Sequence, residues 1–564
     1  MDPRPARRPR PGARRLPEPL PDPDPGGRES AGRGADAASL DGAGGDAEYA
    51  PEDAMTVPVL GHLESLPVAL PELALTGLAA LVLLADLAPR WRGRGVASSL
   101  AIVGMAVVLP LVVVAHARAT GTAGYADAGE IRLFRGAVAY DGAAALMKAL
   151  LAVVGLLGLL FSRPSLRRRE LGEGELAGLL VTAVLGMCLL ASASSLLMLA
   201  VALELTSLPA YAMTGLLRRN RRSSEAALKY AIFGAVATGT MIYGISLLLG
   251  IAGTAALDAI GPALEARRSS GAPCDPSLAV AFLLILVGLG YKVAAVPFHF
   301  WCPDAYEGAP TAVTAFLSVG PKAAGFAALL RLTDGCFGGP LAHGDFPWQA
   351  ILAVLGVATM TIGNLAALPQ RNLKRLFAYS SIAHAGYLLA GAALAGPSGA
   401  QAVLFYLVVY AFMNLGAFAC VLALEDHLCI IDVEGCRGVG WKHPGLAAAF
   451  TVFLLSLTGI PPVAGFAAKL VLFGALVQTG AWPWLALAVA GVLNSVLSLF
   501  YYARIIRSMY LEHPPATEAG AVREPLTGFY NALLWICLVP TVALGVAFGP
   551  LVEWTRRAAE AFRN

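Results

Sequence analysis

Long apolar stretches recur along the chain, separated by short polar segments. A helix needs about 20 mostly apolar residues to cross the hydrocarbon core of a bilayer. The stretches that approach this length lie near 66–88, 95–117, 139–162, 174–192, 194–217, 225–252, 278–298, 310–332, 349–368, 373–394, 399–424, 446–475, 483–503 and 527–552. They are too long for strands, and none alternates with the period of two that is typical of a membrane barrel. The pattern predicts an all-α polytopic membrane protein with about 14 transmembrane helices.

The composition agrees with a protein that lies largely inside a membrane. Hydrophobic residues make up 57% of the 564 residues and charged residues only 14%, whereas soluble domains carry about 25% charged residues. The net charge of +3 is small and spread along the chain, which argues against a nucleic-acid surface.

The eight cysteines show no spacing that is typical of a metal or redox centre. None forms a C-x-x-C motif, and Cys429 and Cys436 are spaced too widely for a zinc or iron–sulfur site. Most of the others lie in apolar stretches, where cysteine serves as a small hydrophobic residue. We therefore expect this chain to bind no metal and no cofactor.

Residues 1–54 are rich in Pro, Arg and Gly and hold almost no large apolar side chains. Such a segment cannot form a core and is predicted to be a disordered extension. It has no continuous apolar region, so it does not resemble a secretory signal. The alternative is that translation starts at Met55.

Clusters of Arg and Lys follow the first, third, fifth, ninth and thirteenth predicted spans. Because cytoplasmic loops carry an excess of these residues, those ends are predicted to face the cytoplasm. Both termini then lie on the outer, periplasmic side. The Arg-rich extension would have to be exported, which favours a start at Met55.

Of the ionisable residues inside predicted spans, four stand out: Glu204 in the fifth, Lys292 in the seventh, Lys322 in the eighth and Lys469 in the twelfth. A Lys or Asp at mid-bilayer costs ~2.5–3.5 kcal/mol, so each is a candidate functional residue. One buried Glu–Lys pair could merely neutralise itself, but three lysines in three spans need more partners than the sequence offers. Moving a partner carboxylate changes a lysine's affinity for a proton, so these residues are candidates for a proton path.

Prolines interrupt two of these spans close to their lysines. Pro297 follows Lys292 by five residues, and Pro461 and Pro462 precede Lys469. Proline opens a helix and frees backbone carbonyls, as transporters do at ion sites near the midplane. The sequence therefore predicts a broken, hinge-like helix beside a lysine in each half of the chain, as an internal repeat would produce.

Five further residues are candidates for supporting roles. Glu225 and Lys229 are four residues apart on one helix face, as an ion pair requires. His384 and His299 could relay protons because histidine titrates near neutral pH, although such a histidine often only hydrogen-bonds a neighbouring helix. Tyr291 could order water beside Lys292, or serve only in helix packing.

Several segments together resemble one known family. They are LELTSLPAYAM, SSEAALKYAIFGA, YKVAAVPFHFWCPDAYEGAPTAVTAFLSVGPKAAGFAALLR, NLKRLFAYSSIAHAGYLLAG and GIPPVAGFAAKLVLF. They are similar to subunit N of the bacterial proton-translocating NADH–quinone oxidoreductases (respiratory complex I). The likeness extends from about residue 56 to about residue 510, and the long central block is the most specific part.

The resemblance implies an antiporter-like fold with two inverted five-helix repeats, spans four to eight and nine to thirteen. The implied divisions are an extension (1–54), a three-helix segment (55–170), a first repeat (171–335), a second repeat (345–510) and a C-terminal loop with the last helix (511–564). Glu204 and Lys292 match the family's partnered pair, Lys322 its bridging lysine and Lys469 its exit-side lysine. Glu225 and Lys229 match the paired charges of the sixth span.

By the same resemblance, the chain would conduct protons in the membrane arm of a translocase, coupled to electron transfer from NADH to a quinone such as ubiquinone. NADH, FMN, the iron–sulfur clusters and the quinone would be bound by other subunits. The expected partners are other membrane-arm subunits and the lipid of the bacterial inner membrane, with no nucleic acid. Two alternatives remain: a subunit of a multisubunit sodium/proton antiporter or membrane-bound hydrogenase, and a structural membrane subunit that conducts nothing.

Overall fold

The apolar stretches form helices in the computed structural model, which describes residues 57–88, 90, 95–125, 129–168, 172–270, 276–338, 346–513 and 526–562. The predicted extension at 1–54 lies outside these residues. The longer helices are α2 (Leu70–Leu87), α3 (Val96–Thr120), α5 (Gly142–Arg168), α6 (Glu173–Ala191), α7 (Leu196–Thr214), α8 (Arg221–Ala252), α10 (Pro276–Val293), α12 (Thr311–Phe337), α13 (Trp348–Ala367), α14 (Leu373–Ala392), α15 (Pro397–Leu428), α17 (Pro444–Thr458), α18 (Ala464–Gln478), α19 (Trp482–Leu511) and α20 (Gly528–Val546).

Among the described residues, 12 of these helices are long and apolar enough to cross a membrane. Helix α14 has a similar length but begins with Lys374 and Arg375, which lower its hydropathy. The short apolar helices α17 and α18 occupy the place of the predicted twelfth span. Each predicted span therefore has a helical counterpart, and the prediction of an all-α polytopic membrane protein is confirmed.

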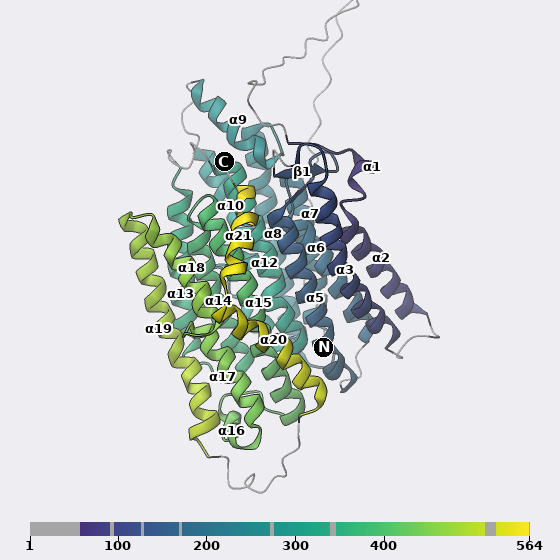
Figure 1. Ribbon diagram of the computed structural model, residues 1–564, viewed down its shortest axis with the longest axis vertical. Coiled ribbons are helices and arrows are strands. Elements are labelled where there is room, and N and C mark those ends of the chain that lie inside the picture. The colour runs from purple at the N-terminus through teal and green to yellow at the C-terminus, as the bar shows by residue number, and fades with distance from the viewer. Residues whose placement is uncertain are drawn as a thin grey trace, which may run out of the picture. The chain divides into compact units, whose positions relative to one another are not determined.

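Short elements join the long helices. They are α1 (His62–Ser65), α9 (Leu257–Ser269), α11 (Trp301–Gly308), α16 (Val439–Lys442), α21 (Gly549–Ala559), the 3-10 turns Glu434–Cys436 and Glu560–Phe562, and the strands β1 (Glu130–Leu133) and β2 (Val138–Asp141). Figure 1 shows β1, α1 and α9 at one end of the bundle and α16 at the other. We call these the hairpin end and the α16 end.

Three details differ from the predicted spans. The residues before Gly142 form strand β2, which pairs antiparallel with β1 so that Ile131 faces Tyr140; the third span was predicted to begin near 139. The last predicted span is divided, because α20 ends at Val546 and α21 begins at Gly549. Helix α21 carries Glu553, Arg556 and Arg557, whose charges favour the surface of the bundle over its apolar interior.

Helices α12 and α15 lie at the centre of the bundle. In the spanning window of α12 every residue is buried, and in that of α15 94% are buried. By contrast, α2, α3, α19 and α20 bury about a third of theirs and expose apolar side chains such as Leu84, Val113 and Phe500. Such exposed apolar surface suits contact with lipid or with neighbouring membrane subunits.

The seventh and twelfth spans are broken, as the prolines predicted. Helix α10 ends at Val293 and α11 begins at Trp301, so Pro297 lies between them; Pro461 and Pro462 lie between α17 and α18. In the order of spans these breaks have matching places, since each is the fourth helix of its predicted repeat.

Candidate functional site

The break between α10 and α11 brings Lys292 to the interior of the bundle. Lys292 lies in the last turn of α10 and is 1% exposed. Its ammonium donates a hydrogen bond to Ser207 Oγ at 2.9 Å. Glu204 lies one turn from Ser207 on α7, half-buried, and attracts the Lys292 ammonium electrostatically. Among the described residues no carboxylate forms an ion pair with Lys292, whose hydrogen-bond partner is the hydroxyl of Ser207.

Lys322 lies near the middle of α12 and is 2% exposed. Its ammonium donates to the backbone oxygen of Ser381 at 2.8 Å and to Ser381 Oγ at 2.5 Å. The same Oγ accepts a hydrogen bond from Tyr410 at 2.9 Å and lies 3.4 Å from the hydroxyl of Tyr306. Ser381 therefore joins α12, α14 and α15 around the lysine.

Lys292 and Lys322 approach the same stretch of α12. A Cβ atom on Gly325 would lie 3.3 Å from Lys292 Cγ, so only glycine gives the stem of Lys292 comfortable room there. Lys322 is three residues earlier on α12 and so lies on the same side of that helix as Gly325.

The break between α17 and α18 surrounds Lys469 with neutral oxygens. Lys469 is 5% exposed and donates to the backbone oxygens of Thr458 at 2.6 Å and Leu457 at 3.2 Å, and to Ser495 Oγ at 2.7 Å. Because α17 ends at Thr458, these carbonyls belong to the negative end of a helix dipole, which favours a cation. No carboxylate contacts Lys469 in the described ranges.

His384 lies between the surroundings of Lys322 and Lys469. Its Nδ1 is 2.8 Å from the hydroxyl of Tyr406, and its ring centroid is 5.1 Å from that of Tyr410 and 5.6 Å from that of Tyr387. Tyr410 contacts the serine that holds Lys322, and Lys469 lies 4.9 Å from the centre of the Tyr387 ring. Polar side chains thus link the two lysines across the bundle.

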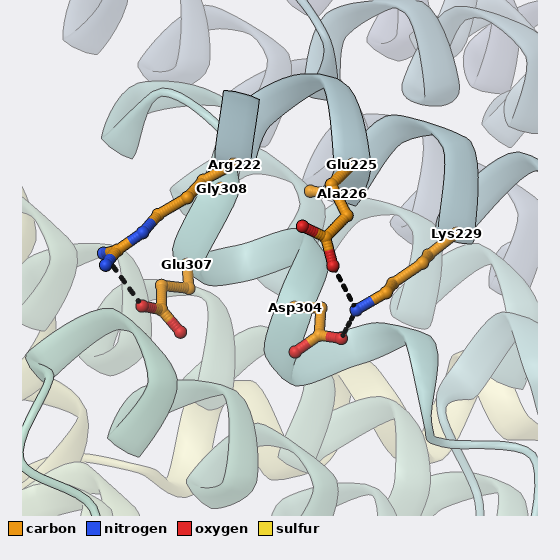
Figure 2. A pocket seen from close by; sticks show the side chains of 7 residues that line it. All are labelled: Arg222, Glu225, Ala226, Lys229, Asp304, Glu307 and Gly308. Atoms are coloured by element: carbon orange, nitrogen blue, oxygen red, sulfur yellow. Dashed lines mark hydrogen bonds and ion pairs between the residues drawn. The ribbon is translucent and has the colours of Figure 1, made fainter. Parts of the chain in front are cut away.

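A charged cavity of about 200 Å³ opens at the α16 end and includes Lys229 (Figure 2). Lys229 Nζ lies 2.8 Å from Glu225 and 2.7 Å from Asp304. Arg375 lies 2.7 Å from Asp304 and 3.1 Å from Glu307. The predicted contact between Glu225 and Lys229 is present, and it belongs to a larger network of charges.

Two candidate side chains do not contact the lysines. Tyr291 donates its hydroxyl hydrogen to the backbone oxygen of Tyr230 at 2.7 Å, which turns it towards α8. His299 packs against Phe300 with ring centroids 4.6 Å apart, and its buried Nδ1 has no hydrogen-bond partner among the described residues. The expectation that Tyr291 and His299 serve the proton path stays a prediction.

Other charged pairs lie at the hairpin end, and sequence reasoning missed them. Lys148 contacts Glu72 at 2.6 Å; Arg331 contacts Asp141 at 2.9 Å. Arg132 contacts Glu130 at 2.6 Å and Asp258 at 3.3 Å. Most of these residues lie towards the ends of predicted spans or between them, where charges are ordinary. Lys148 is the exception, since it lies well inside the third predicted span and is fully buried, a signal that sequence reasoning overlooked.

The described residues contain no group of three His, Cys, Asp or Glu side chains that could hold a metal ion. The cysteines that the structure describes are free, and Cys429 alone of them is exposed. Buried lysines and their hydroxyl partners therefore remain the groups on which a function of the described interior can be argued.

Comparisons with known proteins agree with this geometry. A family model described as "NADH:quinone oxidoreductase/Mrp antiporter, TM" matches residues 193–498. "NADH-quinone oxidoreductase subunit N 2" of Sorangium cellulosum is 43% identical over 517 residues, which are 89% of this chain and 99% of the relative. "NADH-quinone oxidoreductase subunit N" of Anaeromyxobacter sp. is 42% identical over 450 residues, covering 77% of this chain and 86% of the relative.

Solved structures give the same result. A chain of the respiratory complex I from Thermus thermophilus with bound aureothin matches with a TM-score of 0.68 and 33% identity, covering 86% of this chain and 98% of that one. A chain of the Mrp complex from Dietzia sp. matches with a TM-score of 0.72 at 23% identity, covering 89% and 97%. At that identity the second likeness concerns the fold alone.

Proposed function

This chain belongs to the family of NADH-quinone oxidoreductase N subunits and is an antiporter-like membrane-arm subunit, and we propose that its buried lysines and Glu204 form the route along which it conducts protons. The observation that supports this most directly is the burial of three lysines, Lys292, Lys322 and Lys469, which are at most 5% exposed. Each donates a hydrogen bond to a serine hydroxyl, that of Ser207, Ser381 or Ser495 respectively.

The mechanism follows from the electrostatics of an apolar interior. Two like charges repel much more strongly there than in water, so a proton on Lys292 makes protonation of Lys322 less favourable. When Glu204 moves nearer to Lys292, it stabilises the ammonium; when it moves away, the proton is released towards α12. Ser381, Tyr410 and His384 then provide hydrogen-bonding groups on the way to Lys469.

The chain itself would supply only the proton route. Electrons would pass from NADH through FMN and iron–sulfur clusters to a quinone in other subunits. Part of the signal for proton movement would arrive from a neighbouring membrane-arm subunit beside α8. Lys229 and Glu225 there have side chains 41% and 56% exposed, and charges exposed on the flank of a membrane helix need a polar partner.

We further propose that the protein lies in the bacterial inner membrane with its α16 end in the cytoplasm. Arg and Lys in the loops of that end favour this side. Val59 bridges to Arg132 at the hairpin end, and the C-terminus lies at the same end (Figure 1). Both ends of the described chain then face outwards, as an even number of spans requires. The proposed repeats, 171–335 and 345–510, carry one broken helix each.

The proposed role of Lys292 is tested in the assembled oxidoreductase in lipid vesicles. Lys292→Ala should lower NADH-driven proton uptake and quinone reduction together, because the two are coupled, while Lys229→Ala should act more mildly from the flank. Assembly of each variant is checked first by the subunit content of the purified complex. Full proton stoichiometry in Lys292→Ala would contradict the proposal and favour a structural subunit.

A further inference from the structure

Helices α12 and α15 share a line of polar side chains that meets the route between the lysines only at its inner end, at Lys322 and Tyr410. On α12 the line consists of Thr311, Thr314, Ser318 and Lys322, which recur at steps of three and four residues and so lie on one helix face. Thr311, Thr314 and Ser318 are each at most 1% exposed. A one-sided row of hydroxyls in the most enclosed helix of the bundle is unusual for a face that serves packing alone.

The facing side of α15 carries Glu425, Asn414 and Tyr410. Glu425 precedes the end of α15 by one turn and is half-buried, whereas Asn414 and Tyr410 are buried. Eleven residues, about three helical turns, separate Glu425 from Asn414, and four separate Asn414 from Tyr410. All three therefore lie on one face.

The two rows are joined by hydrogen bonds. The Thr311 hydroxyl donates to Glu425 Oε2. Asn414 Nδ2 donates to Ser318 Oγ at 2.6 Å. At the inner end, Tyr410 donates to the Oγ of Ser381, which holds Lys322. The line therefore runs from a carboxylate at the α16 end to the lysine at the middle of the bundle.

An unpartnered buried atom lies midway along this line. Asn414 is fully buried, and its Oδ1 accepts no hydrogen bond from any described residue. A buried acceptor without a donor costs about 1–3 kcal/mol, and a bridging water is the usual remedy. Successive hydroxyls on α12 are about 4.5–6 Å apart along the axis, a separation that one water molecule bridges.

From this juxtaposition we propose that Glu425 collects protons at the α16 end and delivers them to Lys322 along the Thr311–Thr314–Ser318 face of α12. This uptake branch rests on the proposed function, because it needs Lys322 to gain and lose a proton. Glu425 takes a proton from water at the α16 end and becomes a neutral acid. It passes that proton through bridging waters to the free amine of Lys322, which becomes an ammonium as the carboxylate is restored.

The competing interpretation is that Glu425 only caps α12. Thr311 is the first residue of that helix, where a carboxylate is favoured by the dipole. Lys374 donates to the backbone oxygen of Ala309 at 3.0 Å. A cation therefore lies near the first turn of α12 as well. A cap would support folding and assembly but would not need an exchangeable proton.

The test uses the assembled oxidoreductase in lipid vesicles, with NADH-driven proton uptake as the readout. Glu425→Gln keeps an acceptor for Thr311 but carries no exchangeable acid, and it should slow uptake about ten-fold or more. Millimolar formate, a small acid that can carry protons to the α16 end, should restore most of the rate. Glu425→Asp should retain most of it without formate. Glu434→Gln, at an exposed carboxylate of the same end, is the matched control and should leave uptake unchanged.

Lys322→Ala separates this inference from the proposed function. If Lys322→Ala abolishes uptake while Glu425→Gln pumps normally, the uptake branch is wrong and the lysine route stands. If both variants pump normally, both proposals fail. Slow uptake in Glu425→Gln that formate does not restore would identify a structural cap and overturn the inference.

Discussion

Lys292 and Lys469 lie beside matching helix breaks, but their surroundings differ in kind. Lys292 has a carboxylate, Glu204, within electrostatic reach and one hydroxyl in contact. Lys469 has two backbone carbonyls and one hydroxyl in contact. A side-chain carboxylate can move, whereas the carbonyls of a helix end are fixed by the backbone. In the proposed proton route, the first site would therefore respond to a change of charge nearby, and the second would receive a proton at a constant affinity.

The largest expected effect on proton uptake comes from removing the charge of Glu204. Glu204→Gln keeps the size of the side chain but deprives Lys292 of electrostatic support, so NADH-driven proton uptake should fall about ten-fold or more. Measurement of proton uptake and quinone reduction in vesicles checks this. A variant that pumps at the normal rate would show that the two breaks work alike and would remove the basis of the comparison.

A strong effect is also expected from a substitution that disturbs the backbone around Lys469. Gly459 has a φ of +90°, and a Cβ there would lie 2.7 Å from Lys469 Cδ. Gly459→Ala therefore combines backbone strain of about 1–2 kcal/mol with displacement of the lysine, and uptake should fall several-fold. Gly474→Ala on α18 is the control, since a Cβ there meets no atom within 4 Å. Equal uptake by the two variants would contradict the dependence on carbonyl geometry.

Removing the hydroxyl beside Lys469 should have a smaller effect. Ser495→Ala leaves both backbone carbonyls in place, and one hydrogen bond to a charged group is worth about 1.5–3 kcal/mol, part of which water restores. We expect a two- to three-fold loss of uptake, about 0.5 kcal/mol. A loss as large as that of Glu204→Gln would mean that the helix end contributes little to holding the cation.

The smallest effect concerns the hairpin beside the first three spans, which has no counterpart in the second repeat. Burial raises the pKa of Glu130 to about 7, against the opposing attraction of Arg132. An acid whose pKa is raised on folding stabilises the fold least when ionised, so local stability is greatest below pH 4.5 and declines as the pH rises through 7. Hydrogen exchange of residues 130–141, corrected for intrinsic rates, should show less protection at pH 8 than at pH 5. In Glu130→Gln this difference should disappear, and its persistence would assign the pH dependence to another group.

Hydropathy alone predicted the spans, and the cost of burying charge singled out Lys292, Lys322 and Lys469, which the structure buries, but not Lys148, which it buries as well. The prolines located both helix breaks. These signals are local, because a single stretch of chain contains both the apolar run and the lysine or proline that interrupts it. The division into two repeats rests on the family resemblance and stays a prediction.

The partners of the lysines could not be predicted, because they come from distant parts of the chain. Ser207 is 85 residues from Lys292, and Asp304 is 75 residues from Lys229. Serine, tyrosine and backbone carbonyls are too common in membrane helices to stand out. Glu204 acts on Lys292 electrostatically, while the hydrogen bond of Lys292 goes to Ser207, a distinction that depends on side-chain geometry.

The complete enclosure of α12 has a consequence for how such a subunit can adapt to different membranes. Bilayer thickness and lipid headgroups act on α2, α3, α19 and α20, whose outer faces are exposed, and cannot touch Lys322. Substitutions on the exposed faces of these outer helices can therefore adapt the subunit to different lipids without changing the surroundings of Lys322. The enclosed helix insulates transport from the membrane in which it operates.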